Sequence, residues 1–446
     1  MNNPEKGYYI QTFGCQMNER DTEILAGMLK QLGYQKAGTL KNADIILFNT
    51  CCVREKAENK VLSQLGELKD LKSHNPDLII GVCGCMVQQE GMPELIRKSA
   101  PHVDLLFGTH NIHELPDLIE NILASRNPQI SVWDSEGKVR EQLPSEREFP
   151  FKALVNITYG CNNFCTYCIV PYVRGRERSR YPRHIIQEIK DLAADGVIEV
   201  MLLGQNVNSY GKDLNEITID FADLLAQIDE IEGIERIRYM TSHPRDFSEK
   251  LIKVISASKK VCQHFHLPVQ SGSNKILDKM NRGYSREQYI DLIAKIREYH
   301  SAAVITTDFI VGFPGETEAD FQDTLDLVGK IKFDGAFTFI YSTRTGTPAA
   351  KFKNQIPLEI KKARIQELNS KINDAGKEIN MGYLNKVMDV LVEGPSKTNS
   401  RMLSGKTEGN KTVIFQGDPM QIGKIVPVLI TEPQTWILKG IMKENE

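Results

Sequence analysis

The sequence lacks any apolar run that approaches the roughly 18 residues of a membrane-spanning helix. It also lacks a basic stretch followed by an apolar one near its start, so we expect no secretory signal peptide. Both absences predict a cytoplasmic protein without membrane contact, in which cysteines stay reduced. No internal repeat or low-complexity tract occurs in the 446 residues, and the hydrophobic content of 41% is typical of a globular chain.

A strong net charge is also missing, since 55 lysines and arginines face 58 acidic residues and the net charge is −3. This balance excludes a polycationic nucleic-acid coat, but it is compatible with a local basic patch that binds nucleic acid. The sequence contains two such patches. They consist of Arg174, Arg176, Arg178, Arg180 and Arg183 with Tyr172 and Tyr181 between them, and of Lys351, Lys353, Lys361, Lys362 and Arg364.

Residues 1–125 alternate between strand and helix patterns. The expected strands are residues 8–13, 43–49, 78–82 and 103–107, and the expected helices are residues 18–32, 54–71, 92–98 and 115–123. Repeated strand-then-helix units predict a doubly wound parallel sheet, so the chain belongs to the α/β class. Residues 126–147 are polar, with scattered proline and glycine, and are expected to be a linker with one short strand.

A second strand-and-helix series follows in residues 148–380. Its expected strands are residues 153–158, 198–203, 236–240, 264–268, 305–313 and 336–341. Six units are fewer than the eight of a closed barrel, so we expect a partial, open (β/α)6 barrel. After a long helix at 357–379, residues 381–446 show short strands with turn signals, which predict a small OB-like β-barrel.

Nine cysteines in an intracellular chain indicate metal or redox chemistry. Cys161, Cys165 and Cys168 directly follow the first strand of the second series, with the spacing C-x3-C-x2-C. Cysteine thiolates are the usual ligands of iron–sulfur clusters. Three ligands leave one iron of a four-iron cluster open, as catalytic metal sites require. A zinc knuckle is the alternative, but it would need a fourth cysteine or histidine nearby, and His184 is far away in sequence.

Further cysteines follow three strands of the first series: Cys15 follows the first, Cys51 and Cys52 the second, and Cys83 and Cys85 the third. The carboxyl ends of parallel strands share one edge of a sheet, which is where ligands bind. We therefore expect these three loops to converge although they are far apart in sequence.

The cysteine motif after the first barrel strand resembles that of the radical S-adenosylmethionine (SAM) enzymes. Residues 202–207 (LLGQNV), 266–273 (HLPVQSGS) and 308–316 (DFIVGFPGE) also resemble motifs of that family. The resemblance implies that the open iron binds the amino and carboxylate groups of SAM, which is cleaved to methionine and a 5′-deoxyadenosyl radical. It also implies a set of SAM-binding residues: Tyr167, Gly204, Gln205, Asn206, His266, Gln270 and Gly312.

The segments TFGCQMN, NTC and GCM around Cys15, Cys51 and Cys85 resemble the methylthiotransferase branch of that family. This implies that these three cysteines hold a second, auxiliary [4Fe-4S] cluster with an open iron for sulfide, polysulfide or a methylated sulfur. Cys52, Cys83 and Cys262 are not in ligand register and are expected to be buried small hydrophobes. No catalytic residue beyond the six cluster ligands is expected.

The segments TFGCQMNERDTE and NTCCVREK are most similar to the tRNA 2-methylthio-N6-isopentenyladenosine synthases. The resemblance implies insertion of a methylthio group at C2 of the isopentenylated adenosine next to the anticodon. One SAM would donate the methyl group and a second would supply the radical. Two alternatives share this chemistry but act on threonylcarbamoyl-adenosine or on a ribosomal protein side chain. An iron–sulfur RNA-binding protein without turnover is a further alternative.

The C-terminal β-domain resembles the TRAM domain, a small RNA-binding barrel. The implied partners are a tRNA anticodon stem-loop, an electron donor of flavodoxin or ferredoxin type, and a sulfur donor or iron–sulfur carrier. RNA loops are recognised through stacked bases and phosphate contacts. The expected substrate contacts are Gln16, Asn18, Arg174, Arg176 and Arg178.

Overall fold

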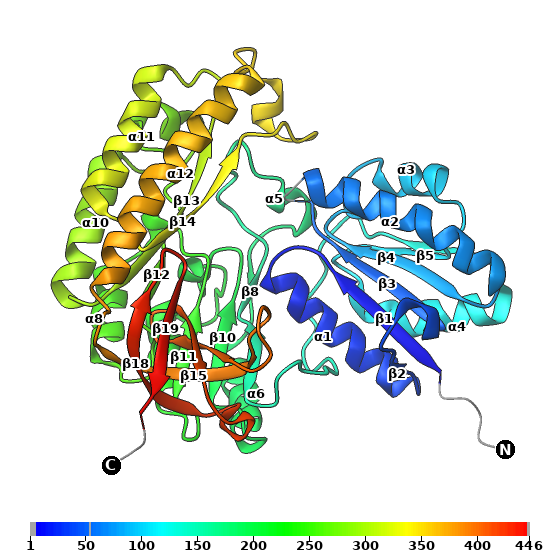
Figure 1. Ribbon diagram of the computed structural model, residues 1–446. Coiled ribbons are helices and arrows are strands. Elements are labelled where there is room, and N and C mark those ends of the chain that lie inside the picture. The colour runs from blue at the N-terminus through cyan, green and yellow to red at the C-terminus, as the bar shows by residue number, and fades with distance from the viewer. Residues whose placement is uncertain (1–5, 53–54, 444–446) are drawn as a thin grey trace.

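The computed structural model describes residues 6–52 and 55–443. The chain forms three units, an N-terminal sheet domain, a central barrel and a small C-terminal barrel (Figure 1). The N-terminal sheet has six parallel strands in the order β2-β1-β3-β4-β5-β6. In sequence order they are β1 (Gly7–Thr12), β2 (Gln35–Lys36), β3 (Ile45–Thr50), β4 (Ile79–Gly84), β5 (Leu105–Phe107) and β6 (Gln129–Ser131).

Helices cover both faces of this sheet. Leucines and isoleucines of α1 (Gln16–Gln31) and α4 (Leu115–Ser125) pack on one face, and those of α2 (Glu55–His74) and α3 (Met92–Ser99) pack on the other. The doubly wound arrangement expected from the sequence is therefore confirmed. The helix that we expected from Arg54 begins at Glu55 in the structure, and Arg54 itself lies outside the described residues.

Two short edge strands were less visible in the sequence. The strand β2 has two exposed residues and no apolar pattern, and it was not predicted. The strand β6 is the one short strand expected within residues 126–147, and it pairs with β5 as the last strand of the sheet. The N-terminal sheet thus reaches Ser131, beyond the boundary expected at residue 125.

The central unit contains six parallel strands, in two groups of three. The groups are β7 (Lys152–Asn156), β10 (Glu199–Leu203) and β11 (Arg236–Tyr239), and β12 (His264–His266), β13 (Val304–Val311) and β14 (Gly335–Ile340). A bridge between Ile237 and Val261 joins the groups, which gives the partial barrel that we expected.

Helices form the outer layer of this barrel and share one apolar core with its strands. They are α6 (Pro182–Ala194), α7 (Phe221–Asp229), α8 (Glu249–Ala257), α10 (Arg286–Tyr299), α11 (Glu318–Ile331) and α12 (Leu358–Met381). Two short helices, α5 (Val170–Val173) and α9 (Asn274–Lys279), and the small hairpin of β8 (Thr158–Tyr159) and β9 (Arg178–Ser179) lie in the connections.

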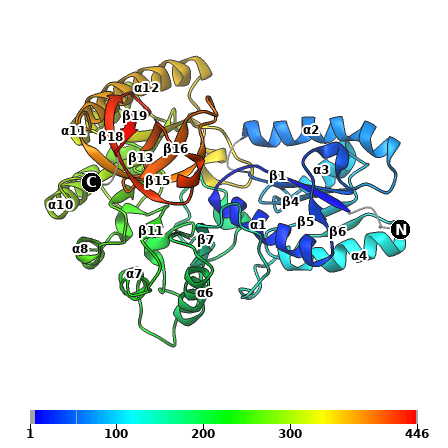
Figure 2. The same cartoon turned by 60° about the horizontal axis from the view of Figure 1, so that its bottom comes forward.

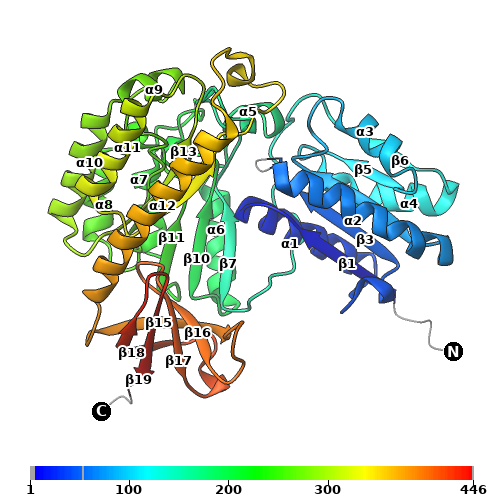
Figure 3. The same ribbon diagram turned by 45° about the horizontal axis from the view of Figure 1, so that its top comes forward.

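The C-terminal unit is a closed five-stranded barrel in the order β15-β16-β17-β19-β18. Its strands are β15 (Val387–Pro395), β16 (Leu403–Thr407), β17 (Thr412–Gln416), β18 (Ile425–Pro433) and β19 (Ile437–Met442). It lies at the amino ends of the central strands, opposite the cysteine loop (Figure 3). Arg236 and Arg238 of β11 fix it there by donating to backbone carbonyls of Asp389, Lys406, Thr407 and Glu408 at 2.8–2.9 Å.

Helix α1 lies beside β7, between the N-terminal sheet and the barrel (Figure 2). The carboxyl end of β1, where α1 begins, therefore faces the barrel. Within the described residues, no helix is long and apolar enough to cross a membrane.

Candidate iron–sulfur and SAM sites

The loop after β7 carries the C-x3-C-x2-C motif and is fixed by the backbone around it. Gly160 has a φ of +75°, and a Cβ atom there would lie 2.1 Å from the carbonyl oxygen of Arg176, so only glycine fits. The Cys161 amide donates to the Gly175 carbonyl at 3.2 Å, and the Thr166 amide donates to the Met280 carbonyl at 3.0 Å. The three thiols are thus held at the carboxyl edge of the barrel.

The donor set of this loop fits an iron–sulfur cluster. Burial raises the pKa of Cys161 to about 11 and that of Cys168 to about 12, so both thiols keep their protons at neutral pH until a metal displaces them. Two groups already donate to sulfur. The Asn163 amide lies 3.5 Å from the Cys161 Sγ, and Nη1 of Arg282 lies 3.4 Å from the Cys165 Sγ.

Unpartnered polar atoms gather around the same edge of the barrel. The side-chain oxygens of Gln205 and Gln270, both expected SAM ligands, are buried and have no hydrogen-bond partner among the described residues. Buried polar atoms in proteins are nearly always hydrogen-bonded, so these oxygens fit a polar ligand such as SAM. Further atoms of this kind belong to residues that the sequence reasoning missed, namely Asn156, Asn208, Tyr239, Ser242 and His243. The signal that could have found them is a polar residue at the last position of a barrel strand, as for Asn156 and Tyr239, or in the segment that follows it.

The unpartnered ring nitrogen of His243 is a hydrogen-bond donor. Its Nδ1 accepts the Arg245 amide proton at 3.3 Å, so the neutral ring carries its own proton on the unpartnered Nε2. Burial, with a smaller effect of the Arg282 charge, lowers the pKa of His243 to about 2, which keeps the ring neutral. His243 therefore offers a hydrogen-bond donor to an acceptor on a ligand.

Other expected SAM ligands are already engaged with protein atoms. Asn206 donates to Asp246 at 2.8 Å, and the Tyr167 hydroxyl accepts from Arg282 at 3.5 Å. His266 lies 3.1 Å from the Thr306 hydroxyl. The two glycines permit close packing, since a Cβ at Gly204 would lie 2.4 Å from Thr158 Cγ2 and one at Gly312 would lie 2.3 Å from Lys361 Cγ. Gly312 thus packs against α12.

The cysteine loops of the N-terminal sheet converge as predicted, and Asn18 holds them together. Its Nδ2 donates to the carbonyls of Phe13 and Thr50, both at 2.9 Å, and its Oδ1 lies 3.9 Å from the Sγ atoms of Cys15 and Cys85. A Cβ at Gly14 would lie 2.6 Å from the Cβ of Cys51, so Cys51 packs against the same loop. Three thiols, from the ends of β1, β3 and β4, therefore lie at one edge of the sheet, and thiolates are the usual ligands of iron–sulfur clusters. Asn18 was expected to contact RNA but is fully buried.

The three remaining cysteines are buried, as expected. Cys52 packs with Cys85, Ile169 and Val173. A hydrogen bond from Cys52 and the positive charge of Arg174 lower the pKa of Cys85 to about 6, although burial opposes them.

Arg174 was expected to contact RNA, but the structure places it in the interior. It comes from the end of α5 and is 5% exposed. Its Nε donates to the Cys85 Sγ at 3.2 Å, and its Nη2 donates to Asn18 Oδ1 at 2.8 Å and to Asp21 Oδ2 at 2.7 Å. Arg174 therefore links the barrel to the cysteine edge of the N-terminal sheet.

Much of the predicted basic surface is occupied by similar internal contacts. Arg178 donates to the Gly137 carbonyl at 2.9 Å, and Arg180 pairs with Glu141 and Glu188. Lys361 and Arg364 of the second patch are buried, and Arg364 pairs with Glu316 at 2.7 Å. Arg176, which stacks on Phe164 at 4.4 Å, and Arg183 remain exposed.

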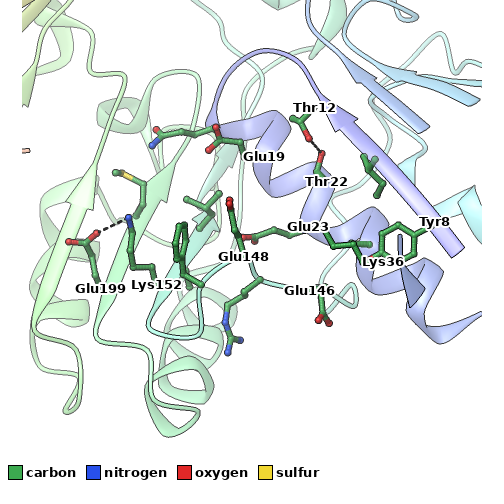
Figure 4. Close-up of a pocket in the computed structure, with 18 residues that line it drawn as sticks. Tyr8, Thr12, Glu19, Thr22, Glu23, Lys36, Glu146, Glu148, Lys152 and Glu199 are labelled. Atoms are coloured by element: carbon green, nitrogen blue, oxygen red, sulfur yellow. Dashed lines mark hydrogen bonds and ion pairs between the residues drawn. The ribbon is translucent and has the colours of Figure 1, made fainter. Parts of the chain in front are cut away.

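Gln16 lines two cavities beside the cysteine edge. The first has a volume of about 390 Å³ and lies between β1, α1 and the start of β7 (Figure 4). Five glutamates and three basic residues line it: Glu19, Glu23, Glu146, Glu148 and Glu199, and Lys36, Arg147 and Lys152. The second, of about 820 Å³, also reaches Lys397 and Lys406 of the C-terminal barrel. The acidic first cavity disfavours phosphate, whereas the second joins Gln16 to the C-terminal domain.

The fold and the thiol-bearing barrel edge define a radical SAM protein. Residues 155–328 match the family described as Radical SAM superfamily, residues 7–108 match Uncharacterized protein family UPF0004, and residues 382–443 match the TRAM domain. Membership of the radical SAM superfamily supports an iron–sulfur cluster and SAM as cofactors.

Curated relatives match along the whole chain. One is a tRNA-2-methylthio-N(6)-dimethylallyladenosine synthase of Pelotomaculum thermopropionicum, 56% identical over 99% of this chain and 98% of the relative. Another, with the same name, comes from Moorella thermoacetica and is 56% identical over 99% of both chains. This chain belongs to the tRNA-2-methylthio-N(6)-dimethylallyladenosine synthase family of radical SAM methylthiotransferases.

Solved structures with lower identity support the fold alone. The radical SAM methyltransferase TsrM of Kitasatospora setae, solved with cobalamin and a [4Fe-4S] cluster, matches with a TM-score of 0.55 and 13% identity. The match covers 78% of this chain and 77% of that one.

Proposed function

We propose that this chain inserts a methylthio group at C2 of N6-isopentenyladenosine adjacent to the anticodon of tRNA. The observation that carries the proposal is the pair of cysteine-bearing edges, one on each α/β unit, in a chain that is 56% identical over nearly its full length to relatives with that named activity. C2 of adenine bears an unactivated C–H bond, so a cofactor-derived radical suits the reaction better than acid–base chemistry.

Cys161, Cys165 and Cys168 would hold the SAM-cleaving cluster, and Cys15, Cys51 and Cys85 would hold the auxiliary cluster. When bound, the clusters and two SAM molecules supply the radical, the methyl group and the sulfur. The residues of the chain position and shield these groups. Gln205, Gln270 and His243 offer buried polar atoms that can orient SAM, and Asn18 gathers the loops of the second set. Four of the six thiols are buried, Cys168 is half-buried and Cys15 is exposed, so the N-terminal set is the one that solvent can reach.

The tRNA is the substrate that the C-terminal domain and the relatives' names favour. The larger cavity extends from Lys397 and Lys406 of that domain to Gln16, the neighbour of Cys15 in sequence, and would give a target base a polar route towards the N-terminal cysteine loops. The base would leave its stack to reach them. Arg176 and Arg183 remain available for phosphate contacts. A cytoplasmic flavodoxin or ferredoxin would supply electrons, and a sulfur donor or iron–sulfur carrier would supply sulfur.

Mass spectrometry of tRNA nucleosides from a deletion strain tests the substrate. The strain should lose methylthio-isopentenyladenosine and accumulate isopentenyladenosine, and the intact gene should restore the modified base. An unchanged level of the modified base would refute the substrate assignment. Anaerobic incubation of the purified protein with SAM and dithionite should release 5′-deoxyadenosine, and failure to release it would refute the radical chemistry.

A further inference from the structure

Each thiol set has one buried arginine that donates a hydrogen bond to one of its cysteines. In the barrel this is Arg282, which is 4% exposed. Its Nη1 donates to the Cys165 Sγ at 3.4 Å, its Nη2 to the Pro268 carbonyl at 2.6 Å, and its Nε to the Tyr284 hydroxyl at 3.1 Å. At the N-terminal sheet it is Arg174, which donates to the Cys85 Sγ at 3.2 Å.

The two arginines differ in their counter-ions. Arg174 forms an ion pair with Asp21 at 2.7 Å, so most of its charge is compensated by a carboxylate of the N-terminal domain. Arg282 donates hydrogen bonds to neutral oxygens and to the Cys165 sulfur, and no carboxylate among the described side chains lies within ion-pair distance of it. A guanidinium keeps its proton in a protein, and a buried charge requires a compensating one.

Three thiolates bring three negative charges to the edge where Arg282 lies. They can compensate the charge of its guanidinium, and Cys165 is in direct contact with it. Hydrogen bonds to sulfur and the local charge are among the factors that set the reduction potential of an iron–sulfur cluster. An uncompensated positive charge favours the reduced cluster, because reduction adds one negative charge. A compensated arginine retains the hydrogen bond but loses most of the charge effect.

We propose that Arg282 raises the reduction potential of the cluster held by Cys161, Cys165 and Cys168, and that Asp21 cancels the corresponding effect of Arg174 on the second set. This inference rests on the proposed function, which assigns both clusters. A single electron from a low-potential carrier, such as a reduced flavin or iron–sulfur protein, is thereby directed to the cluster that cleaves SAM. Both arginines act through the clusters and are positioning residues.

Redox titration of single-cluster proteins, monitored by electron paramagnetic resonance, tests this proposal. The full-length variant Cys15→Ala/Cys51→Ala/Cys85→Ala keeps only the barrel cluster. Adding Arg282→Gln to this variant should make reduction of the barrel cluster about tenfold less favourable. For one electron, this equals a fall in the midpoint potential of about 59 mV. Arg282→Lys retains the charge and should shift the midpoint by less. The matched control is Arg180→Gln, since Arg180 is buried and its hydrogen bonds among the described residues go to Glu141, Glu188 and the Asn156 carbonyl, with none to a thiol.

The second set provides the opposite test. In Cys161→Ala/Cys165→Ala/Cys168→Ala, the further change Asp21→Asn should raise the midpoint of the auxiliary cluster, because it leaves the Arg174 charge uncompensated. Equal midpoints in Arg282→Gln and Arg180→Gln, or an unchanged midpoint in Asp21→Asn, would overturn the proposal. Iron content separates this failure from a failure of the proposed function. Absence of iron from both parent variants would overturn the two-cluster assignment itself, and the inference with it.

Discussion

The two cysteine edges are built in different ways. The barrel edge takes its thiols from a single loop, in which Cys161 and Cys168 lie within one short motif. The N-terminal edge gathers thiols from the ends of three strands, and Asn18 bonds two of those strand ends together through buried backbone carbonyls. A local motif needs only its own loop to be in place, whereas a dispersed set needs the whole sheet. Cluster binding at the barrel edge should therefore be lost when a cysteine ligand is changed. Cluster binding at the N-terminal edge should also be lost when a residue that positions the strand ends is changed.

Removing one thiol from each edge should have the largest effect and should separate the two edges. Cys161→Ala should abolish release of 5′-deoxyadenosine and product formation together. Cys15→Ala should retain SAM cleavage but lose insertion of the methylthio group, because it leaves the barrel edge intact. Chromatography of 5′-deoxyadenosine alongside mass spectrometry of the tRNA measures both. Equal loss of cleavage in the two variants would show that the edges do not work independently.

A change to the scaffold should damage the N-terminal edge alone. Gly14→Ala places a Cβ 2.6 Å from the Cβ of Cys51, at a φ of +125° that L residues rarely adopt. We expect a loss of stability of about 1–3 kcal/mol from this strain, and loss of iron from the N-terminal set. Gly38→Ala is the matched control, because a Cβ at Gly38 meets no atom within 4 Å. Iron content and thermal unfolding measure the outcome, and a full iron content in Gly14→Ala would contradict it.

A buried carboxyl next to the cysteine loop of the barrel, Glu177, should make the stability of the protein depend on pH. Burial raises the pKa of Glu177 to about 7 from 4.5. Because the folded-state pKa is the higher one, the contribution of Glu177 to stability is most favourable below pH 4.5 and falls as the pH rises towards 7. Glu177→Gln should therefore stabilise the protein at pH 8 by up to about 3 kcal/mol and have little effect at pH 4. Urea unfolding at both pH values measures the difference, and an equal effect at both would refute it.

Loss of an exposed arginine should have the smallest effect. Arg176→Ala should weaken tRNA binding by less than about tenfold and reduce the salt dependence by about one phosphate contact. Lys253→Ala, on the outer helix α8 and paired with Glu249, is the control. Filter binding at several salt concentrations tests this, and an unchanged salt slope in Arg176→Ala would remove it from the RNA surface.

The same contrast explains what the sequence could predict. Parallel strand ends and a local cysteine motif follow from short-range patterns, so the three units, the convergence of the cysteine loops and the setting of Gln205 and Gln270 were all foreseeable. Arg174 was not, because its partner Asp21 is 153 residues away in sequence and nothing local indicates the ion pair. His243 was missed because its importance depends on which of its ring nitrogens lacks a partner.

The attachment of the C-terminal barrel also bears on how specificity could change. Arg236 and Arg238 donate hydrogen bonds to the backbone carbonyls of Asp389, Lys406, Thr407 and Glu408. A backbone carbonyl is present whatever the side chain at that position. The attachment therefore depends on the backbone path at these four residues and does not depend on their side chains. Side-chain substitutions that change RNA recognition by this domain can therefore accumulate without weakening its attachment to the central barrel.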